Sequence, residues 1–146
     1  MSELPALSQL SLYVLLVLIG ALTFIIWWAQ IGVLNGKPFR NPDGSVDDWH
    51  EQKIFYGISL ADVFVACPAA FAGIILFFLA PKWGLYTLAI VSFWLVWANT
   101  MTTATSLRFE KPKITLQWFV VFPFGAIVGL LYIVWTVVHF NIIYAP

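Results

Sequence analysis

Four long stretches without Asp, Glu, Lys or Arg dominate the hydrophobic pattern of this 146-residue chain. A helix needs about 20 apolar residues to cross a bilayer. Backbone polar groups must be satisfied internally in lipid, so stretches of this kind are helical. The pattern therefore predicts one all-α integral membrane domain, residues 1–146, built as an antiparallel bundle of four transmembrane helices. We expect these spans at about residues 10–34, 55–79, 83–107 and 116–142.

The connections between the spans predict the orientation of the chain. The middle connection, 80–82, is so short that the second and third helices must be antiparallel neighbours. Cytoplasmic loops carry an excess of Lys and Arg, so we expect loops 35–54 and 108–115 in the cytoplasm and both termini outside. The apolar run after the N-terminus is too long for a signal peptide and should remain a span. The opposite side carries Lys82, whereas the two cytoplasmic loops carry Lys37, Arg40, Lys53, Arg108, Lys111 and Lys113.

Composition supports the membrane assignment and excludes several function classes. The chain is 62% hydrophobic and 10% charged, which is too little polar surface for a soluble domain of this length. Its formal net charge is +0, whereas nucleic-acid binding needs a basic stripe. Cys67 is the only cysteine, so this chain alone forms neither an internal disulfide nor a CxxC redox pair.

Asp62 is the only Asp, Glu, Lys or Arg within the predicted spans. An ionised Asp inside a membrane helix costs roughly 2.5–3.5 kcal/mol, and such residues usually serve a function. Helical spacing places Asp62 on a face of small residues, where another helix can approach closely. Each predicted span has one such inward face. These faces comprise Gly20, Thr23, Trp27 and Gln30; Ser59, Asp62, Ala66, Ala69 and Gly73; Ser92, Asn99, Thr102, Thr103 and Ser106; and Gly125, Gly129, Tyr132, Thr136 and His139.

Depth selects the residues that can meet Asp62. With the expected orientation, Gln30, Asn99 and Thr103 lie in the same cytoplasmic half of the bundle as Asp62, while His139 lies near the opposite surface. We predict a ligand-binding site of Asp62, Asn99, Thr103, Gln30 and Trp27. It would hold a ligand head group, a cation or a proton. Alternatively, Asp62 only locks the second helix to the third through hydrogen bonds.

Two weaker patterns are compatible with a metal site. His50 and Glu51 lie in an acidic cluster with Asp43, Asp47 and Asp48, and carboxylates and imidazole are suitable ligands for a divalent cation. Turn and helix-cap chemistry explains most of that cluster equally well. His139 could ligate haem or a chlorophyll magnesium, although a single His near the end of a span is usually only hydrogen-bonded.

Small residues and prolines predict how the helices pack. Gly125 and Gly129 form a GxxxG motif, which supports close packing within the bundle or in a dimer; Ala66 and Gly73 would serve the same purpose in the second helix. Pro68 and Pro123 remove backbone donors and favour kinks.

These features favour a non-catalytic protein, acting as an accessory subunit of a membrane complex or as a binder of a lipid, quinone or pigment. Its expected partners are membrane lipids and other membrane subunits or further copies of itself. The first alternative is a transporter or channel subunit that uses Asp62 as a proton or cation site. The second is a membrane enzyme acting on a lipid, with His50, Glu51 and Asp62 at the cytoplasmic interface.

Overall fold

The structure, a computed structural model, describes residues 4–37, 53–110 and 112–144. All the regular secondary structure of these residues is helical, and three helices are long and apolar enough to cross a membrane: Ala6–Leu34, Tyr56–Leu79 and Pro81–Arg108. The elements in chain order are α1 (Ala6–Leu34), α2 (Lys53–Ala61), the π-helical turn η2 (Asp62–Ala66), α3 (Cys67–Leu79), α4 (Pro81–Thr105), the π-helical turn η3 (Ser106–Glu110), α5 (Leu116–Val121), α6 (Phe124–Val138) and α7 (Phe140–Tyr144).

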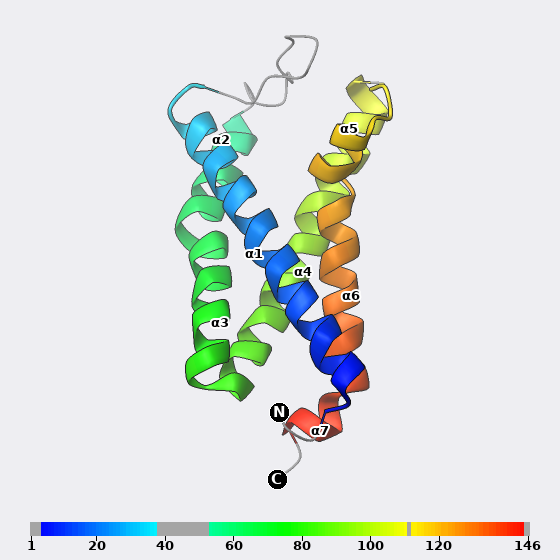
Figure 1. Cartoon of the computed structure of the whole chain (residues 1–146). Coiled ribbons are helices and arrows are strands. Elements are labelled where there is room, and N and C mark those ends of the chain that lie inside the picture. Colours follow the sequence, from blue (N-terminus) through cyan, green and yellow to red (C-terminus); the bar gives the residue numbers. More distant parts are fainter. Residues whose placement is uncertain (1–3, 38–52, 111, 145–146) are drawn as a thin grey trace.

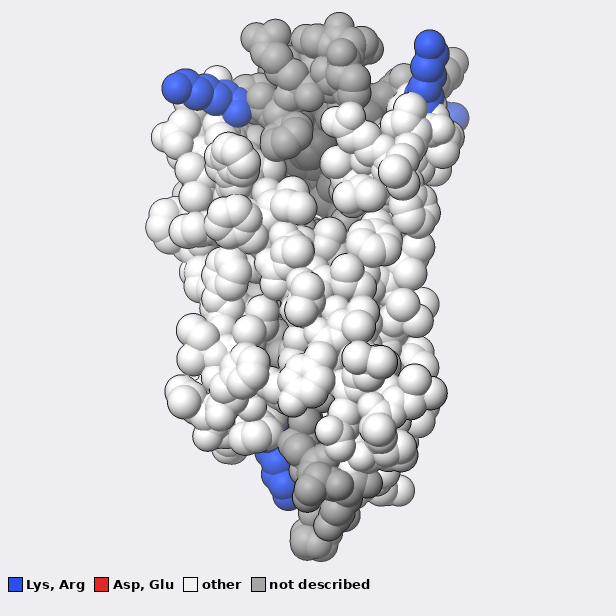
Figure 2. Space-filling view, in the orientation of Figure 1, with Lys and Arg blue, Asp and Glu red and all other residues white. Residues whose placement is uncertain are grey.

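The long helices extend between two ends of an elongated molecule (Figure 1). One end, here called the loop end, carries the last turn of α1, the first turn of α2 and the start of α5. The other end, called the terminal end, carries the first turn of α1, the turn between α3 and α4, and α7. Figure 2 shows Lys and Arg side chains at these two ends and a broad uncharged band between them.

The turn between α3 and α4 consists of Ala80 alone. Pro81 begins α4, a position where its missing N–H removes no helical hydrogen bond. A Cβ atom at Gly84 would collide with the backbone of Phe77, so only glycine permits this close approach of the two helices. The short connection thus makes α3 and α4 a tightly packed helical hairpin.

The GxxxG motif of α6 lies against α4 inside the chain. A Cβ at Gly125 would collide with the Asn99 side chain, and one at Gly129 would lie 2.7 Å from the Ser92 carbonyl oxygen. The motif is compatible with packing inside one chain or between two copies, and the structure shows packing inside the chain.

Helix α1 crosses the other helices diagonally (Figure 1). Towards the loop end it packs against α2, η2 and α3, and towards the terminal end against α6. Its buried side chains are mainly leucines and isoleucine, and they form one core with residues of α3, α4 and α6. Because α1 touches two different groups of helices, polar contacts at its two ends join different parts of the molecule.

The segment expected as the fourth span, residues 116–142, is not one uninterrupted helix, and one of its breaks lies where Pro123 favours a kink. The segment is divided into α5, α6 and α7, with breaks at Phe122–Pro123 and at His139. Pro123 cannot donate a backbone hydrogen bond, which favours the first break. The remaining helix α6 has 15 residues, fewer than a membrane-crossing helix usually needs.

Candidate functional site

Asp62 lies at the first position of η2, and only 4% of its surface is exposed. Its Oδ1 atom accepts a hydrogen bond of 3.0 Å from the Trp94 indole N–H of α4. Its Oδ2 atom accepts one of 3.2 Å from the Gln30 amide of α1. Among the described residues each carboxylate oxygen therefore has one donor, both donors are neutral, and the three residues join three helical segments.

Ser59 fixes the direction in which the Gln30 amide points. The Ser59 hydroxyl, one turn before Asp62 in α2, donates a hydrogen bond of 2.6 Å to Gln30 Oε1. Because the amide oxygen is occupied in this way, the amide nitrogen faces the carboxylate. Ser59, Gln30, Asp62 and Trp94 form a continuous chain of hydrogen bonds, called the Asp62 network below.

The π-helical turn leaves one backbone carbonyl for a side chain to satisfy. The Cys67 N–H bonds to the Asp62 carbonyl, five residues back, instead of to Val63 as in an α-helix. In this register the next N–H would serve Val63, but residue 68 is proline and has none. The Trp27 indole N–H of α1 donates to the Val63 carbonyl instead, at 3.3 Å.

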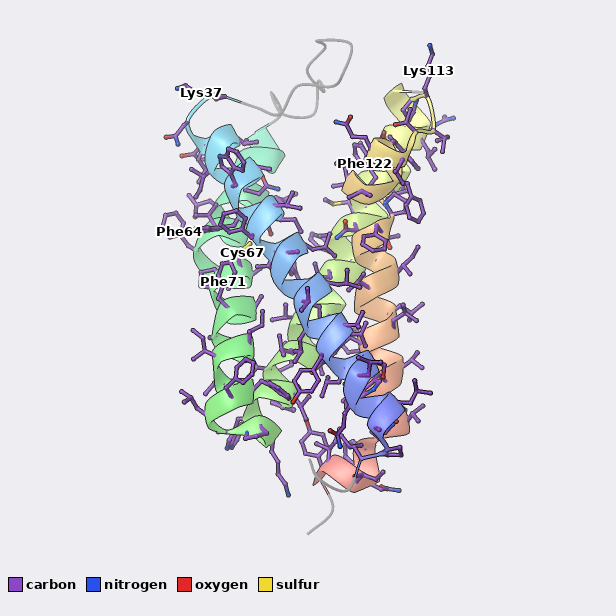
Figure 3. The ribbon with its side chains drawn as sticks, viewed as in Figure 1. Lys37, Phe64, Cys67, Phe71, Lys113 and Phe122 are labelled. Atoms are coloured by element: carbon purple, nitrogen blue, oxygen red, sulfur yellow. The ribbon has the colours of Figure 1, made fainter. Side chains whose placement is uncertain are left out.

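The π-helical turn also shifts the buried face of this helix by one residue. Before the turn, Ser59 and Asp62 are buried, as helical spacing predicts. After it, Cys67 and Ala70 are fully buried in place of the expected Ala66 and Ala69, which are half-buried. Figure 3 shows Cys67 on the inner side of the ribbon and Phe64 pointing outward from it. Gly73, where the two patterns coincide, is buried against Leu88 of α4.

The structure brings Gln30 and Trp27 to the η2 turn, but it does not join Asn99 or Thr103 to Asp62. The Asn99 amide donates to the Leu95 carbonyl at 2.9 Å, and the Thr103 hydroxyl donates to the Asn99 carbonyl at 2.5 Å. Asn99 also packs against Gly125, so this face of α4 meets α6. The expected five-residue site is therefore divided between two helix interfaces.

Trp94 is the main residue that the sequence-based site lacked. Tryptophans of membrane helices concentrate near the interfaces, whereas Trp94 lies in the middle of α4. An indole N–H buried away from water needs an acceptor. The central position of Trp94 is the signal in the sequence that points to a hydrogen bond with Asp62, the only carboxylate of the predicted spans.

Thr23 is a second residue with unexpected surroundings. It is fully buried in α1, one turn before Trp27, and its hydroxyl has no hydrogen-bond partner in the described part of the chain. An unpaired buried hydroxyl is destabilising by about 1–3 kcal/mol.

The proposed metal ligands lie far from this network or outside the described residues. His50 and Glu51 fall in the undescribed segment 38–52. His139 lies at the terminal end, where its Nδ1 is 2.8 Å from the Trp135 carbonyl and its Nε2 is 3.0 Å from the Ser8 hydroxyl. Since a carbonyl only accepts, Nδ1 carries the proton. In the described residues, no three His, Cys, Asp or Glu side chains gather around a possible metal position.

Aromatic stacking and further hydrogen bonds complete this second polar cluster, called the His139 cluster. The rings of Trp135 and His139 stack with centroids 4.4 Å apart. The Trp135 indole N–H lies 3.2 Å from the Ser8 carbonyl and 3.1 Å from the Ser11 hydroxyl. The cluster fastens the start of α1 to the end of α6.

Comparisons with known proteins give no relative. The chain matches no protein-family model, and no curated protein or solved structure is significantly similar to it. Its function must therefore be argued from its own residues, of which the Asp62 network has the most unusual chemistry.

Proposed function

We propose that this chain is a four-pass integral membrane protein. The passes are α1, the combined α2–η2–α3 helix, α4, and the broken segment α5–α6–α7. Two observations support this topology: the uncharged band of Figure 2 and the location of the start of α1 and of α7 at the same end. The excess of Lys and Arg in loops 35–54 and 108–115 favours a cytoplasmic loop end and an external terminal end.

The topology is tested by labelling single cysteines from each side of the membrane. Ser45→Cys and Ser2→Cys are introduced separately into a Cys67→Ala background, because Cys67 is the only native thiol. We expect a membrane-impermeant maleimide to reach the two sites from opposite sides. Labelling of both sites from the same side would rule out the four-pass arrangement with external termini.

Within that topology, the proposed role is non-catalytic: the chain binds a partner helix of a membrane complex or a lipophilic ligand, and Asp62 is the functional group. The observation that carries this proposal is a carboxylate buried among apolar helices whose hydrogen-bond donors, within the described part of the chain, are the neutral groups of Trp94 and Gln30. Intramembrane carboxylates are costly and tend to be functional. Because both donors are neutral, the described residues leave the charge of this 4% exposed carboxylate uncompensated, and a cationic or hydrogen-bonding group of the partner would compensate it on reaching the buried oxygens.

Asp62→Asn tests this role because the amide keeps the size of the side chain and removes the charge. Native mass spectrometry after gentle extraction would identify the bound protein or lipophilic molecule. We expect Asp62→Asn to reduce its occupancy at least about tenfold, which corresponds to roughly 1.4 kcal/mol, while Glu3→Gln, a matched change at the N-terminus, leaves it unchanged. Equal occupancy in both variants would remove Asp62 from the binding role.

A second candidate is a proton- or cation-coupled transporter or channel subunit. The observation favouring it is the same pair of neutral donors, since no Lys or Arg side chain among the described residues bonds to the Asp62 carboxylate. In this role the carboxylate would take up and release the ion. Flux into proteoliposomes that Asp62→Asn abolishes, with no copurifying partner or ligand, would favour transport over binding.

A further inference from the structure

We infer that Trp27 positions the Asp62 carboxylate through the Val63 carbonyl. By accepting the Trp27 indole N–H, that carbonyl allows η2 to stay in its π-helical register. This register keeps Asp62 within reach of Trp94 and Gln30. The contacts alone support the inference; only its importance for activity rests on the proposed role of Asp62.

The register decides where Asp62 points. In a straight α-helix, residues five apart lie about 140° apart around the axis. With α3 held by its buried Cys67, a straight helix would turn Asp62 away from the interior. The π-helical turn removes most of this angle, and both residues are buried in the structure. Phe64, between them, remains on the outer face with 68% of its surface exposed.

Pro68 explains why the turn depends on a side chain from another helix. A π-helical turn normally places a backbone N–H opposite each carbonyl, but Pro68 has none to offer Val63. Val63 is buried, so water cannot take the place of the missing donor. Trp27 supplies the N–H, and its ring is held edge-on against Phe71 of α3, with centroids 6.0 Å apart.

The geometry of α1 couples this contact to the Asp62 network. Trp27 and Gln30 are three residues apart and therefore lie on one face of α1. From that face, Trp27 bonds to the backbone of η2 and Gln30 bonds to the carboxylate of its first residue. One face of α1 thus has two roles. Trp27 stabilises the π-helical register of η2, and Gln30 binds the Asp62 side chain that this register directs inward.

The test reads the surroundings of Asp62 directly. Protein labelled with ¹³C-aspartate and ¹⁵N-tryptophan is placed in lipid nanodiscs, and the two resonances are assigned with Asp62→Asn and Trp94→Phe. We expect Trp27→Phe to move both the Asp62 carboxyl-carbon and the Trp94 indole-nitrogen resonances by more than their linewidths. Trp28→Phe is the matched control, because Trp28 is the adjacent residue and is 68% exposed; it should move neither.

A second variant separates positioning from general packing. Pro68→Ala restores a backbone N–H at residue 68, which makes the Trp27 donor redundant. The resonance shifts caused by Trp27→Phe should therefore fall to less than half in the Pro68→Ala background. Undiminished shifts in that background, or unmoved resonances in Trp27→Phe alone, would overturn the inference.

An isosteric replacement covers the case in which Trp27→Phe does not fold. Substituting the indole of residue 27 with benzothiophene keeps the ring against Phe71 and removes only the N–H. The same two resonances should move; if they stay in place, the inference is wrong. These readouts do not depend on binding or transport, so a failed proposed function and a failed positioning role give different results.

Discussion

Two polar clusters, each with a tryptophan donor, hold α1 in the molecule at opposite ends, α1 contributing Gln30 to one and Ser8 and Ser11 to the other, and they do so with different chemistry. At the Asp62 network, Trp94 donates to a carboxylate that lies within a long apolar helix and is covered on all sides. At the His139 cluster, Trp135 donates to a carbonyl and a hydroxyl at the ends of α1 and α6. Both clusters fasten α1, but only the first contains a charged group buried in an apolar interior.

This difference distinguishes the His139 cluster, which only holds two helices together, from the Asp62 network, which is a candidate functional site. A neutral hydrogen bond contributes about 0.5–1.5 kcal/mol to stability, and a bond to a charged group about 1.5–3 kcal/mol. Neutral hydrogen bonds are enough to hold two helices together, as the His139 cluster shows. The carboxylate of Asp62 adds a desolvation cost that fastening does not require, which is why the proposed function is placed at that end.

The largest effect is expected for Trp94→Phe. The change leaves Asp62 Oδ1 buried without a donor, so the free energy of unfolding should fall by about 2–3 kcal/mol. Steric trapping in bicelles measures this quantity. A loss below about 1 kcal/mol would place the Trp94 bond in the neutral class and remove the contrast between the two ends.

Trp135→Phe is the matched change at the His139 cluster, with an expected loss of only about 1 kcal/mol. Its N–H is shared between two neutral acceptors, and the Ser8 carbonyl keeps a second donor in the Ser11 hydroxyl at 2.9 Å. The same unfolding measurement applies. If Trp135→Phe were as destabilising as Trp94→Phe, burial of the ring rather than the charge of the acceptor would explain both.

The smallest effect, with the opposite sign, is expected for Thr23→Val. Thr23 lies on α1 between the two clusters, and its buried hydroxyl has no partner in the described part of the chain. Valine has nearly the same shape, so the free energy of unfolding should rise by about 1 kcal/mol, the lower end of the cost of an unpaired buried hydroxyl. A decrease would show that the hydroxyl is hydrogen-bonded in the membrane, and would assign Thr23 a place beside the Asp62 network.

The hydrophobic pattern was sufficient to predict three long helices, because uncharged length is a property of each segment alone. The helices α1 and α4 and the combined α2–η2–α3 helix cover most of the residues of the first three expected spans. It was not sufficient for the fourth segment, where Pro123 and His139 interrupt a stretch of uniform hydropathy. A kink at Pro123 follows from its missing N–H, whereas the break at His139 has no comparable signal in the sequence.

The site was predicted in part for a similar reason. Spacing along one helix reveals which residues share a face, and it correctly grouped Trp27 with Gln30. It does not reveal which neighbour that face meets. Asn99 shares the polar face of α4, yet that face packs on α6, while Trp94, five residues earlier, reaches Asp62. Residues five apart lie about 140° apart on an α-helix, so one helix serves two interfaces.

The short length of α6 has a consequence for the lipid around it. Its 15 residues extend over about 22 Å at 1.5 Å per residue, against a hydrocarbon core of about 30 Å. Lipids beside α6 would have to compress, or the flanking pieces α5 and α7 would have to fill the remaining depth. Hydrophobic mismatch sorts proteins among bilayers of different thickness, so in the proposed four-pass topology a fourth pass made of α6 alone would favour thinner membranes, whereas one completed by α5 and α7 would not.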